Sequence, residues 1–214
     1  MSNAVIKDKK NSGFSLVELI VVIAIMAVMI GGGVITMRML IGAEAKQGAK
    51  KMEAQLNDIK TGAMSRAGEY MIVRYIEVSD SNKDALAKAG IDKSGFYAEK
   101  RATTITNADT IVVDYSSDAE YSRIGSKKMA MKVNDSFIIG GASGLTKAIR
   151  IEYNRANGSL KSVQTGTVSG TGLSDTFSGD SDIKLDNIVF QSAAGTGRAY
   201  KIEFDAVTGK HTME

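Results

Sequence analysis

The feature that most constrains this chain is a run of nineteen residues, Leu19 to Met37, without a single ionisable side chain. A helix of about 20 apolar residues is long enough to cross the hydrocarbon core of a bilayer. One acid, Glu18, precedes the run, and the next basic residue after it, Arg38, lies about 30 Å further along a helix. An ionised carboxylate next to hydrocarbon costs roughly 2–3 kcal/mol or more unless it is paired. The sequence therefore predicts a membrane-length helix whose acid needs a cationic partner from outside this segment.

The residues ahead of the run carry a specific order of residue types. From Lys10 to Glu18 the chain reads Lys-Asn-Ser-Gly-Phe-Ser-Leu-Val-Glu. A short basic leader that ends in Gly, followed by Phe and then by Glu as the fifth residue after the Gly, resembles the precursors of type IV pilins and the related pseudopilins. The resemblance is close up to the end of the apolar run and only architectural beyond it.

The resemblance implies a processing site and an assembly site. A membrane aspartyl prepilin peptidase would cut between Gly13 and Phe14, and the new amine of Phe14 would be N-methylated. That cationic amine would meet Glu18 of a neighbouring subunit and set the stagger between subunits, as a buried ion pair can. The alternative is an ordinary membrane anchor whose Glu18 carboxylate rests among the lipid headgroups. An ordinary secretory signal fits less well, because its apolar region has only about 7–15 residues.

Three consecutive glycines, Gly31, Gly32 and Gly33, interrupt the apolar run in a chain that has no proline. Many pilins similar to this one carry a proline near the position of Ile35. Each glycine is less favourable than Ala in a helix by about 0.8–1.0 kcal/mol, so the triplet costs roughly 3 kcal/mol. We therefore interpret the triplet as a weak point that lets the helix unwind during assembly. Close packing of helices in the membrane is an equally good explanation, since small residues permit it.

Charge predicts the orientation and argues against nucleic-acid binding. Lys7, Lys9, Lys10 and Asp8 give the leader a charge of +2, so the amino end is expected in the cytoplasm and the part after Arg38 is expected to be exported. The formal net charge of the whole chain is +3, which leaves 3 − 2 = +1 beyond the leader. The short lysine groups (Lys46, Lys50, Lys51, Lys127 and Lys128) are interpreted as solvated faces rather than as a phosphate-binding surface. The chain has no cysteine, so the exported part is not disulfide-bonded.

Beyond Arg38 the apolar residues follow helical spacing. Ile41, Ala45, Ala49, Met52, Leu56, Ile59 and Ala63 recur at intervals of four and three, which places them in one stripe along a helix. We expect this helix to begin at Phe14 and to end near Ala67. The stripe is expected to pack against a sheet, although a coiled coil is an alternative.

From Tyr70 onward the sequence has the short alternating runs of β-strands. Strands are predicted at 71–78, 110–115, 129–133, 136–139, 148–153, 183–190 and 200–204, each with one buried and one solvent-exposed face. Tight turns are predicted at Asn134-Asp135 and at Asn157-Gly158, a short helix at 83–89 and a mobile loop at 165–182. The predicted fold is α+β and pilin-like, a long N-terminal helix packed on an antiparallel sheet. Its parts are a leader (1–13), a membrane or filament-core helix (14–40), an amphipathic helix (41–68) and a β-rich head (69–214).

The sequence offers little for catalysis. His211 is the only histidine, and Ser143 lacks the glycine pattern of a nucleophile elbow. We therefore expect neither an enzyme nor a cofactor. Asp175, Asp180 and Asp182, with Asp186 nearby, are weak candidates for a calcium site, because hard cations prefer several oxygen ligands. Their spacing does not match an EF-hand.

Taken with the resemblance, these features predict a structural subunit of a type IV pilus. Its partners would be other copies or other pilins in a helical filament, the prepilin peptidase, the membrane and an ATP-driven assembly machine in the inner membrane. It would first be a single-pass protein of the cytoplasmic membrane and then part of a surface filament. The alternatives are a pseudopilin of a type II secretion or competence system, and a single-span protein that never polymerises and displays a binding head.

Overall fold

The computed structural model describes residues 15–65, 69–102, 110–114, 119–140, 145–170, 174–205 and 207–214. The predicted leader and Phe14 lie outside these ranges. The chain forms two compact units, an N-terminal unit (Met1–Arg38) and a head (Met39–Glu214).

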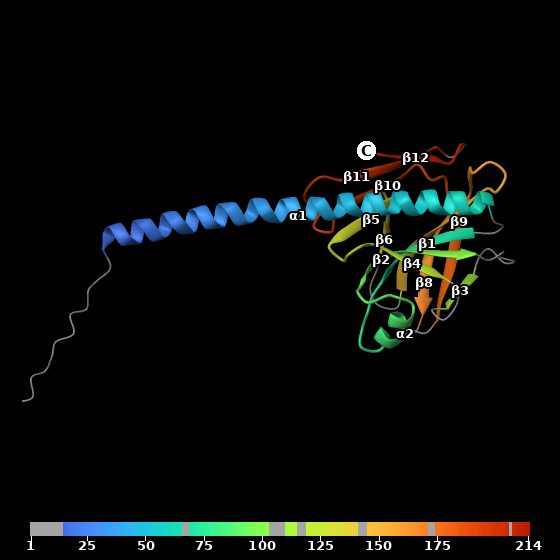
Figure 1. The fold of residues 1–214 in the computed structure, drawn as a ribbon, viewed down its shortest axis with the longest axis horizontal. Helices are drawn as coiled ribbons and strands as arrows, with labels where there is room; N and C mark the ends of the chain where they lie inside the picture. Colours follow the sequence, from blue (N-terminus) through green and yellow to red (C-terminus); the bar gives the residue numbers. More distant parts are fainter. Residues whose placement is uncertain are drawn as a thin grey trace, which may run out of the picture. The chain divides into compact units, whose positions relative to one another are not determined.

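Helix α1 runs from Leu16 to Ser65 and contributes to both units (Figure 1). Ser15 caps its start: the Ser15 hydroxyl oxygen accepts a hydrogen bond from the Val17 amide at 3.3 Å, and the Ser15 carbonyl accepts one from the Leu19 amide at 3.1 Å. Serine is a preferred N-cap because it satisfies amides that lack a partner in the first turn. The predicted helix is thus confirmed over the described residues, while Phe14 and Ala67 lie outside them.

The predicted apolar stripe is confirmed in the head portion of α1. Its six members from Ala45 to Ala63 are between 0% and 2% exposed. The side chain of Ile41 lies outside the described part. Lys46, Lys50 and Lys51 are exposed on the remaining faces of the helix.

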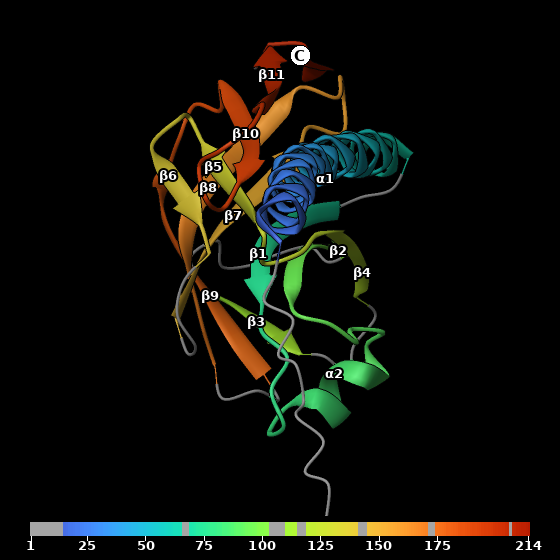
Figure 2. The same ribbon diagram turned by 90° about the vertical axis from the view of Figure 1, so that its left-hand side faces the viewer.

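Two antiparallel sheets and a short helix, α2 (Lys83–Lys88), make up the rest of the head. The seven-stranded sheet has the order β3 (Thr110–Asp114), β9 (Ser174–Asp182), β8 (Leu160–Gly170), β7 (Leu145–Tyr153), β1 (Glu69–Ile76), β2 (Gly95–Ala102) and β4 (Glu120–Gly125). The five-stranded sheet has the order β12 (Lys210–Met213), β11 (Tyr200–Asp205), β10 (Asn187–Ser192), β5 (Met129–Val133) and β6 (Phe137–Ile139). Figure 2 shows the head portion of α1 with strands of both sheets around it.

One main core joins the stripe of α1 to both sheets. Met52 and Leu56 belong to the same buried cluster as Val73 of β1, Ile149 of β7 and Phe190 of β10. A helix with a single apolar stripe must bury that stripe against another layer, and here both sheets contribute to the layer. The expectation of a long helix packed on antiparallel sheet is therefore confirmed for the head.

The second face of the seven-stranded sheet is also buried, which contradicts the predicted solvent-exposed face. In β7, Ala148 and Arg150 alternate with the core residues Ile149 and Ile151, yet all four are buried. Tyr70, Ile72, Ala148, Val168 and Phe177 form a separate cluster drawn from β1, β7, β8 and β9. These strands are consecutive neighbours in the sheet, in the order β9, β8, β7 and β1, so the cluster covers one continuous part of this face. Alternation alone does not reveal that both faces of a strand are buried.

The predicted mobile loop at 165–182 is wrong. These residues form most of the antiparallel strands β8 and β9, paired from Gln164 opposite Asp182 to Gly170 opposite Asp175. Glycine permits the close approach here, because a Cβ on Gly166 would lie 2.3 Å from the Ser178 carbonyl oxygen. Side-chain composition indicated a loop, whereas backbone hydrogen bonding between the two strands decides the structure.

Other local predictions are confirmed or corrected in detail. Asn134 and Asp135 have φ of 49° and 59°, as a tight turn between β5 and β6 requires. Gly158 is also left-handed, but β7 and β8 are joined by the longer segment 154–159 rather than by a tight turn. The strand predicted from Ile183 begins only at Asn187. Strands β2, β4 and β12 were not predicted.

Candidate functional site

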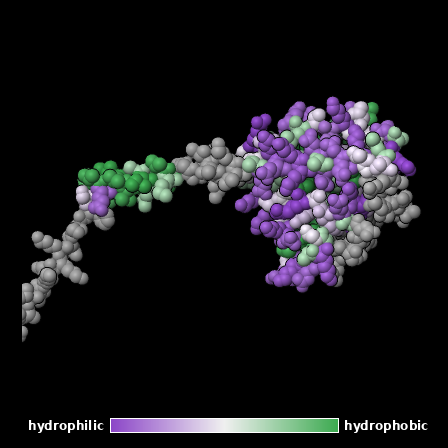
Figure 3. All heavy atoms as spheres, viewed as in Figure 1, coloured by the Kyte–Doolittle hydropathy of each residue, from purple (hydrophilic) through white to green (hydrophobic). Residues whose placement is uncertain are grey.

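The N-terminal segment of α1 is apolar and exposed around its whole circumference. Every residue from Ser15 to Ile30 is exposed, and the large apolar side chains among them are between 42% and 77% exposed. Figure 3 shows that the face in view is hydrophobic along most of the segment, with hydrophilic residues only near its start. Soluble proteins rarely expose contiguous apolar surface of this kind unless it binds another protein or a membrane. This segment, Ser15–Ile30, is the candidate functional site and is called the assembly segment below.

Glu18 lies in the first turn of α1 and is exposed. The amino end of a helix carries a partial positive charge that stabilises a nearby carboxylate by about 0.3–1 kcal/mol. Among the described residues, no lysine, arginine or histidine forms an ion pair with Glu18. The helix end therefore stabilises the Glu18 carboxylate only weakly, and a cationic partner from another molecule stays a prediction. Gly13 and Phe14, the expected cleavage and methylation positions, lie outside the described residues.

Gly31, Gly32 and Gly33 lie within α1, whose backbone is helical through all three. Their interpretation as a weak point remains a prediction. Within the part of the chain that the structure describes, no helix combines the length and the apolarity that crossing a membrane requires.

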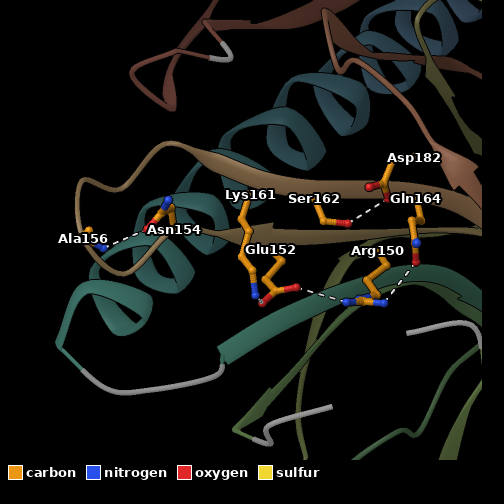
Figure 4. Close-up of polar contacts among 8 residues, drawn as sticks. All are labelled: Arg150, Glu152, Asn154, Ala156, Lys161, Ser162, Gln164 and Asp182. Atoms are coloured by element: carbon orange, nitrogen blue, oxygen red, sulfur yellow. Dashed lines mark hydrogen bonds and ion pairs between the residues drawn. The ribbon is translucent and has the colours of Figure 1, made fainter. Parts of the chain in front are cut away.

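The acidic residues proposed for calcium lie on or after β9. Asp180 and Asp182 are exposed, and Asp182 accepts a hydrogen bond from the Ser162 hydroxyl at 2.9 Å (Figure 4). Asp186 pairs with Lys184 at 2.9 Å, and the side chain of Asp175 lies outside the described part. Over the described ranges, no three acidic, histidine or cysteine side chains lie close enough together to hold a metal ion.

Sequence reasoning missed a network of buried charges on the second face of the seven-stranded sheet. Arg150 of β7 is only 4% exposed and donates to the Gln164 side-chain oxygen and to the Glu152 carboxylate, both at 3.0 Å. Lys161 of β8 pairs with the other oxygen of Glu152 at 2.5 Å (Figure 4). The bonds connect β7 to β8 through side chains as well as through the backbone ladder.

A second buried group connects β1 to β2. Arg74 and Glu99 are 2% and 0% exposed, and their charged atoms are 3.3 Å apart. Arg101 also binds the Glu99 carboxylate. Removing one member of such a group leaves an uncompensated buried charge, which costs about 3–5 kcal/mol. The available signal was a charged residue between apolar neighbours in a strand, as in the Ile-Arg-Ile sequence around Arg150. These groups fix strand pairing and contain no evident nucleophile.

His211 lies on β12 with its ring centroid 5.8 Å from that of Phe204. Burial lowers the pKa of the His211 imidazole below its usual value. The side chain is therefore neutral near pH 7 and contributes to packing against Phe204.

Comparison with known proteins bears on the amino-terminal part of the chain alone. No curated protein and no solved structure matches the chain. Residues 8–34 match the family model of the prokaryotic N-terminal methylation motif. These residues include the expected cleavage position, Glu18 and the glycine triplet. The chain thus carries the prepilin-type cleavage and methylation segment of type IV pilin-like proteins.

Proposed function

We propose that this protein is a structural subunit of a type IV pilus. The observation that carries the proposal is the assembly segment, which follows the prepilin-type cleavage position and exposes apolar side chains on all sides. A surface that is apolar all round cannot be covered by one sheet of the same chain. It suits a helix that is surrounded by lipid before assembly and by other helices afterwards.

Processing would supply the charge that Glu18 lacks. Cleavage between Gly13 and Phe14 creates an amine that stays cationic after methylation. Lipid tails and helix side chains are about equally apolar, so apolar burial alone does not favour one stagger between packed helices. A carboxylate of one subunit paired with the Phe14 amine of the next is satisfied at one stagger only, which gives the filament a defined register.

The orientation, the partners and the role of the head follow from the same processing and assembly route. The leader lysines would keep the amino end in the cytoplasm while the head is exported from the cytoplasmic membrane. The membrane-spanning helix would be the uncharged run Leu19 to Met37. The prepilin peptidase, an ATP-driven inner-membrane machine and other pilins would be the partners, and the filament would reach the cell surface. The head would act as the exposed shell of the filament rather than as an enzyme.

A pseudopilin of a type II secretion or competence system carries the same N-terminal motif. Electron microscopy of cells with an antibody against the head would separate the two functions. Long labelled surface fibres support the pilus, whereas labelling confined to the cell envelope supports the pseudopilus.

The decisive test replaces Glu18→Gln in the native host, with Glu53→Gln in the head portion of the same helix as the matched control. We expect E18Q to lower the yield of sheared filaments at least about tenfold, because an unpaired buried charge costs about 3–5 kcal/mol and 1.4 kcal/mol is tenfold. E53Q should assemble normally. Mass spectrometry should find a mature chain that begins with methylated Phe14 in both variants.

Two results would contradict the proposal. One is a wild-type filament yield from E18Q. The other is an intact leader on the wild-type protein, which would instead support a membrane protein that is anchored by its helix and never polymerises.

A further inference from the structure

His211 lies where strand β12 packs against the head portion of α1. Its ring centroid is 5.8 Å from that of Phe204, the residue opposite it in the β11–β12 pair. The backbone of Glu53 on α1 is close enough to the imidazole to influence its protonation. Both ring nitrogens are buried, and neither makes a hydrogen bond to a residue that the structure describes. Buried polar groups nearly always have a partner, so this imidazole is an exception that needs a reason.

Two further side chains hold this part of the chain on the core. The Lys60 ammonium of α1 donates to the Thr208 carbonyl at 3.2 Å and to the Gly209 carbonyl at 3.1 Å, both just before β12. Met213 is two residues after His211, and therefore on the same side of β12, and it packs against the main core. The strand is at one end of the five-stranded sheet, with β11 as its neighbour there. The docking of β12 on α1 thus depends on few contacts.

The charged groups that face the His211 ring come from α1. They are the Glu53 carboxylate, which favours the charged imidazolium, and the Lys60 ammonium, which disfavours it. The partner on β11, Phe204, is uncharged, and Lys210, the preceding residue of β12, points to the opposite side of the strand. A proton on His211 would therefore add a second positive charge beside Lys60 in a site without a bonded acceptor.

The direction of the pH effect follows from these surroundings. Burial is the main cause of the lowered pKa of His211; Lys60 acts in the same direction, while the backbone of Gly209 and Glu53 and the Glu53 carboxylate oppose it. A released strand has the ordinary histidine pKa of about 6.5, so it binds the proton more readily than the docked strand. Docking is therefore fully stable above about pH 6.5 and weakens as the pH falls toward the lower pKa of the docked state. One proton changes the ratio of released to docked strand by at most about tenfold per pH unit.

We propose that His211 is an acid-sensitive latch, which holds β12 on α1 while the ring is neutral and releases the strand when the ring takes up a proton. Release would separate β12 from β11 and uncover the unpaired edge of β11. An uncovered edge is a place where another strand can pair. The latch lies within the head, so it does not depend on the proposed role of the protein in a filament.

Hydrogen exchange of the full chain in detergent tests the latch. His211 is the only histidine, so no other imidazole titrates between pH 7.5 and pH 5.5. After correction for the intrinsic pH dependence of exchange, amide exchange gives the ratio of open to closed states of each segment. In a peptide that covers 207–214, this ratio should rise by up to about tenfold at pH 5.5, the limit for one proton over this interval. A peptide from β7 (145–153) is the internal reference and should not change.

Two substitutions at the latch remove the titrating group. His211→Gln keeps a polar side chain, and His211→Phe keeps an aromatic ring beside Phe204. Opening of the 207–214 peptide should become independent of pH in both variants. Circular dichroism at both pH values would show that the variants fold, and either variant alone is sufficient for the comparison.

Substitutions of the two facing charges separate a latch from simple packing. Glu53→Gln removes the group that favours the charged ring, so the rise between pH 7.5 and pH 5.5 should become larger. Lys60→Gln removes both carbonyl contacts, so opening should increase at each pH, but the rise on acidification should become smaller. A purely structural role of His211 would not produce these opposite changes.

Three results would overturn the latch. One is a rise in opening of the 207–214 peptide that is the same in H211Q as in the wild-type protein. Another is an equal rise in the β7 peptide, which would show general acid destabilisation of the head. The third is a change of the same direction in E53Q and K60Q. Filament yield does not enter this test, so its outcome and that of the pilus proposal are independent.

Discussion

The assembly segment and the head portion of α1 belong to one helix, yet their apolar residues have opposite surroundings. From Leu16 to Ile30 the large apolar side chains are exposed, whereas from Ala45 to Ala63 the stripe residues are at most 2% exposed. The first portion is apolar on every side, and the second has lysines and acids on the faces away from the stripe. A stripe can be covered by sheets of the same chain. An all-round apolar surface cannot be covered by one layer of the same chain, so the two portions of α1 differ in what can cover them.

The largest expected effect comes from a pair of truncations, one in each portion. Leu56→Ala should lower the free energy of unfolding of the head by about 2–5 kcal/mol, because Leu56 is fully buried and leaves a cavity. Ile23→Ala, at a side chain 58% exposed, should leave head stability unchanged. Urea unfolding of the full chain in detergent, followed by circular dichroism, measures both. Similar losses in the two variants would show that the portions do not differ as described.

Enlarging a small residue tests the same contrast from the opposite direction. Ala49→Leu should destabilise the head by about 1–3 kcal/mol, because Ala49 is fully buried and the added atoms overfill the core. Ala24→Leu, at an exposed position of the assembly segment, should leave the unfolding midpoint unchanged. The comparison would fail if A49L unfolded at the wild-type urea concentration.

The buried hydroxyl of Tyr153, in the core that also contains the apolar stripe of α1, provides a smaller test. Tyr153 is 3% exposed, and its hydroxyl has no hydrogen-bond partner among the described residues. Tyr153→Phe should therefore raise the free energy of unfolding by about 1 kcal/mol, as removal of an unsatisfied polar group can. Unfolding midpoints in urea near neutral pH would measure the gain. A loss of stability would mean that the hydroxyl is satisfied.

The same residue predicts a pH dependence. Burial raises the pKa of Tyr153 above its usual value of about 10, so the unfolded chain releases this proton first as the pH rises. The wild-type head should lose stability above about pH 10, by up to about 1.4 kcal/mol per pH unit from this group. Y153F should lose less between about pH 9 and about pH 11. Parallel pH profiles of the two proteins would contradict the burial of this hydroxyl.

The smallest effect is expected on the polar side of the stripe. Asp58 of α1 accepts a hydrogen bond from Lys100 of β2 at 2.6 Å, and this bond raises the pKa of Lys100. Asp58 is 53% exposed, so Asp58→Asn should cost at most about 1 kcal/mol, and less in high salt. Lys50→Gln, an exposed change on the same helix, is the control. A cost as large as that of L56A would mean that ion pairs rather than the stripe fix α1 to the sheets.

Sequence patterns correctly predicted the features that depend only on residues close together in the chain. The order from Gly13 to Glu18 indicated the prepilin-type segment, and the spacing from Ala45 to Ala63 indicated the buried face of α1. They failed for β8 and β9, where glycines, serines and threonines suggested a loop. Pairing with a neighbouring strand stabilises those residues, and that pairing leaves little trace in local composition. Alternation in β7 likewise predicted an exposed Arg150, whereas the residue is buried and bonded to Gln164 of the neighbouring strand β8.

The sequence by itself determined the uncharged run, its single acid and the stripe that packs on the sheets, because helical periodicity and charge are local properties. Only the tertiary structure decided that Arg74, Glu99 and Arg150 are buried. These arrangements depend on contacts between residues far apart in the chain. The pairing of strands β1, β2, β7 and β8 in the seven-stranded sheet creates those contacts.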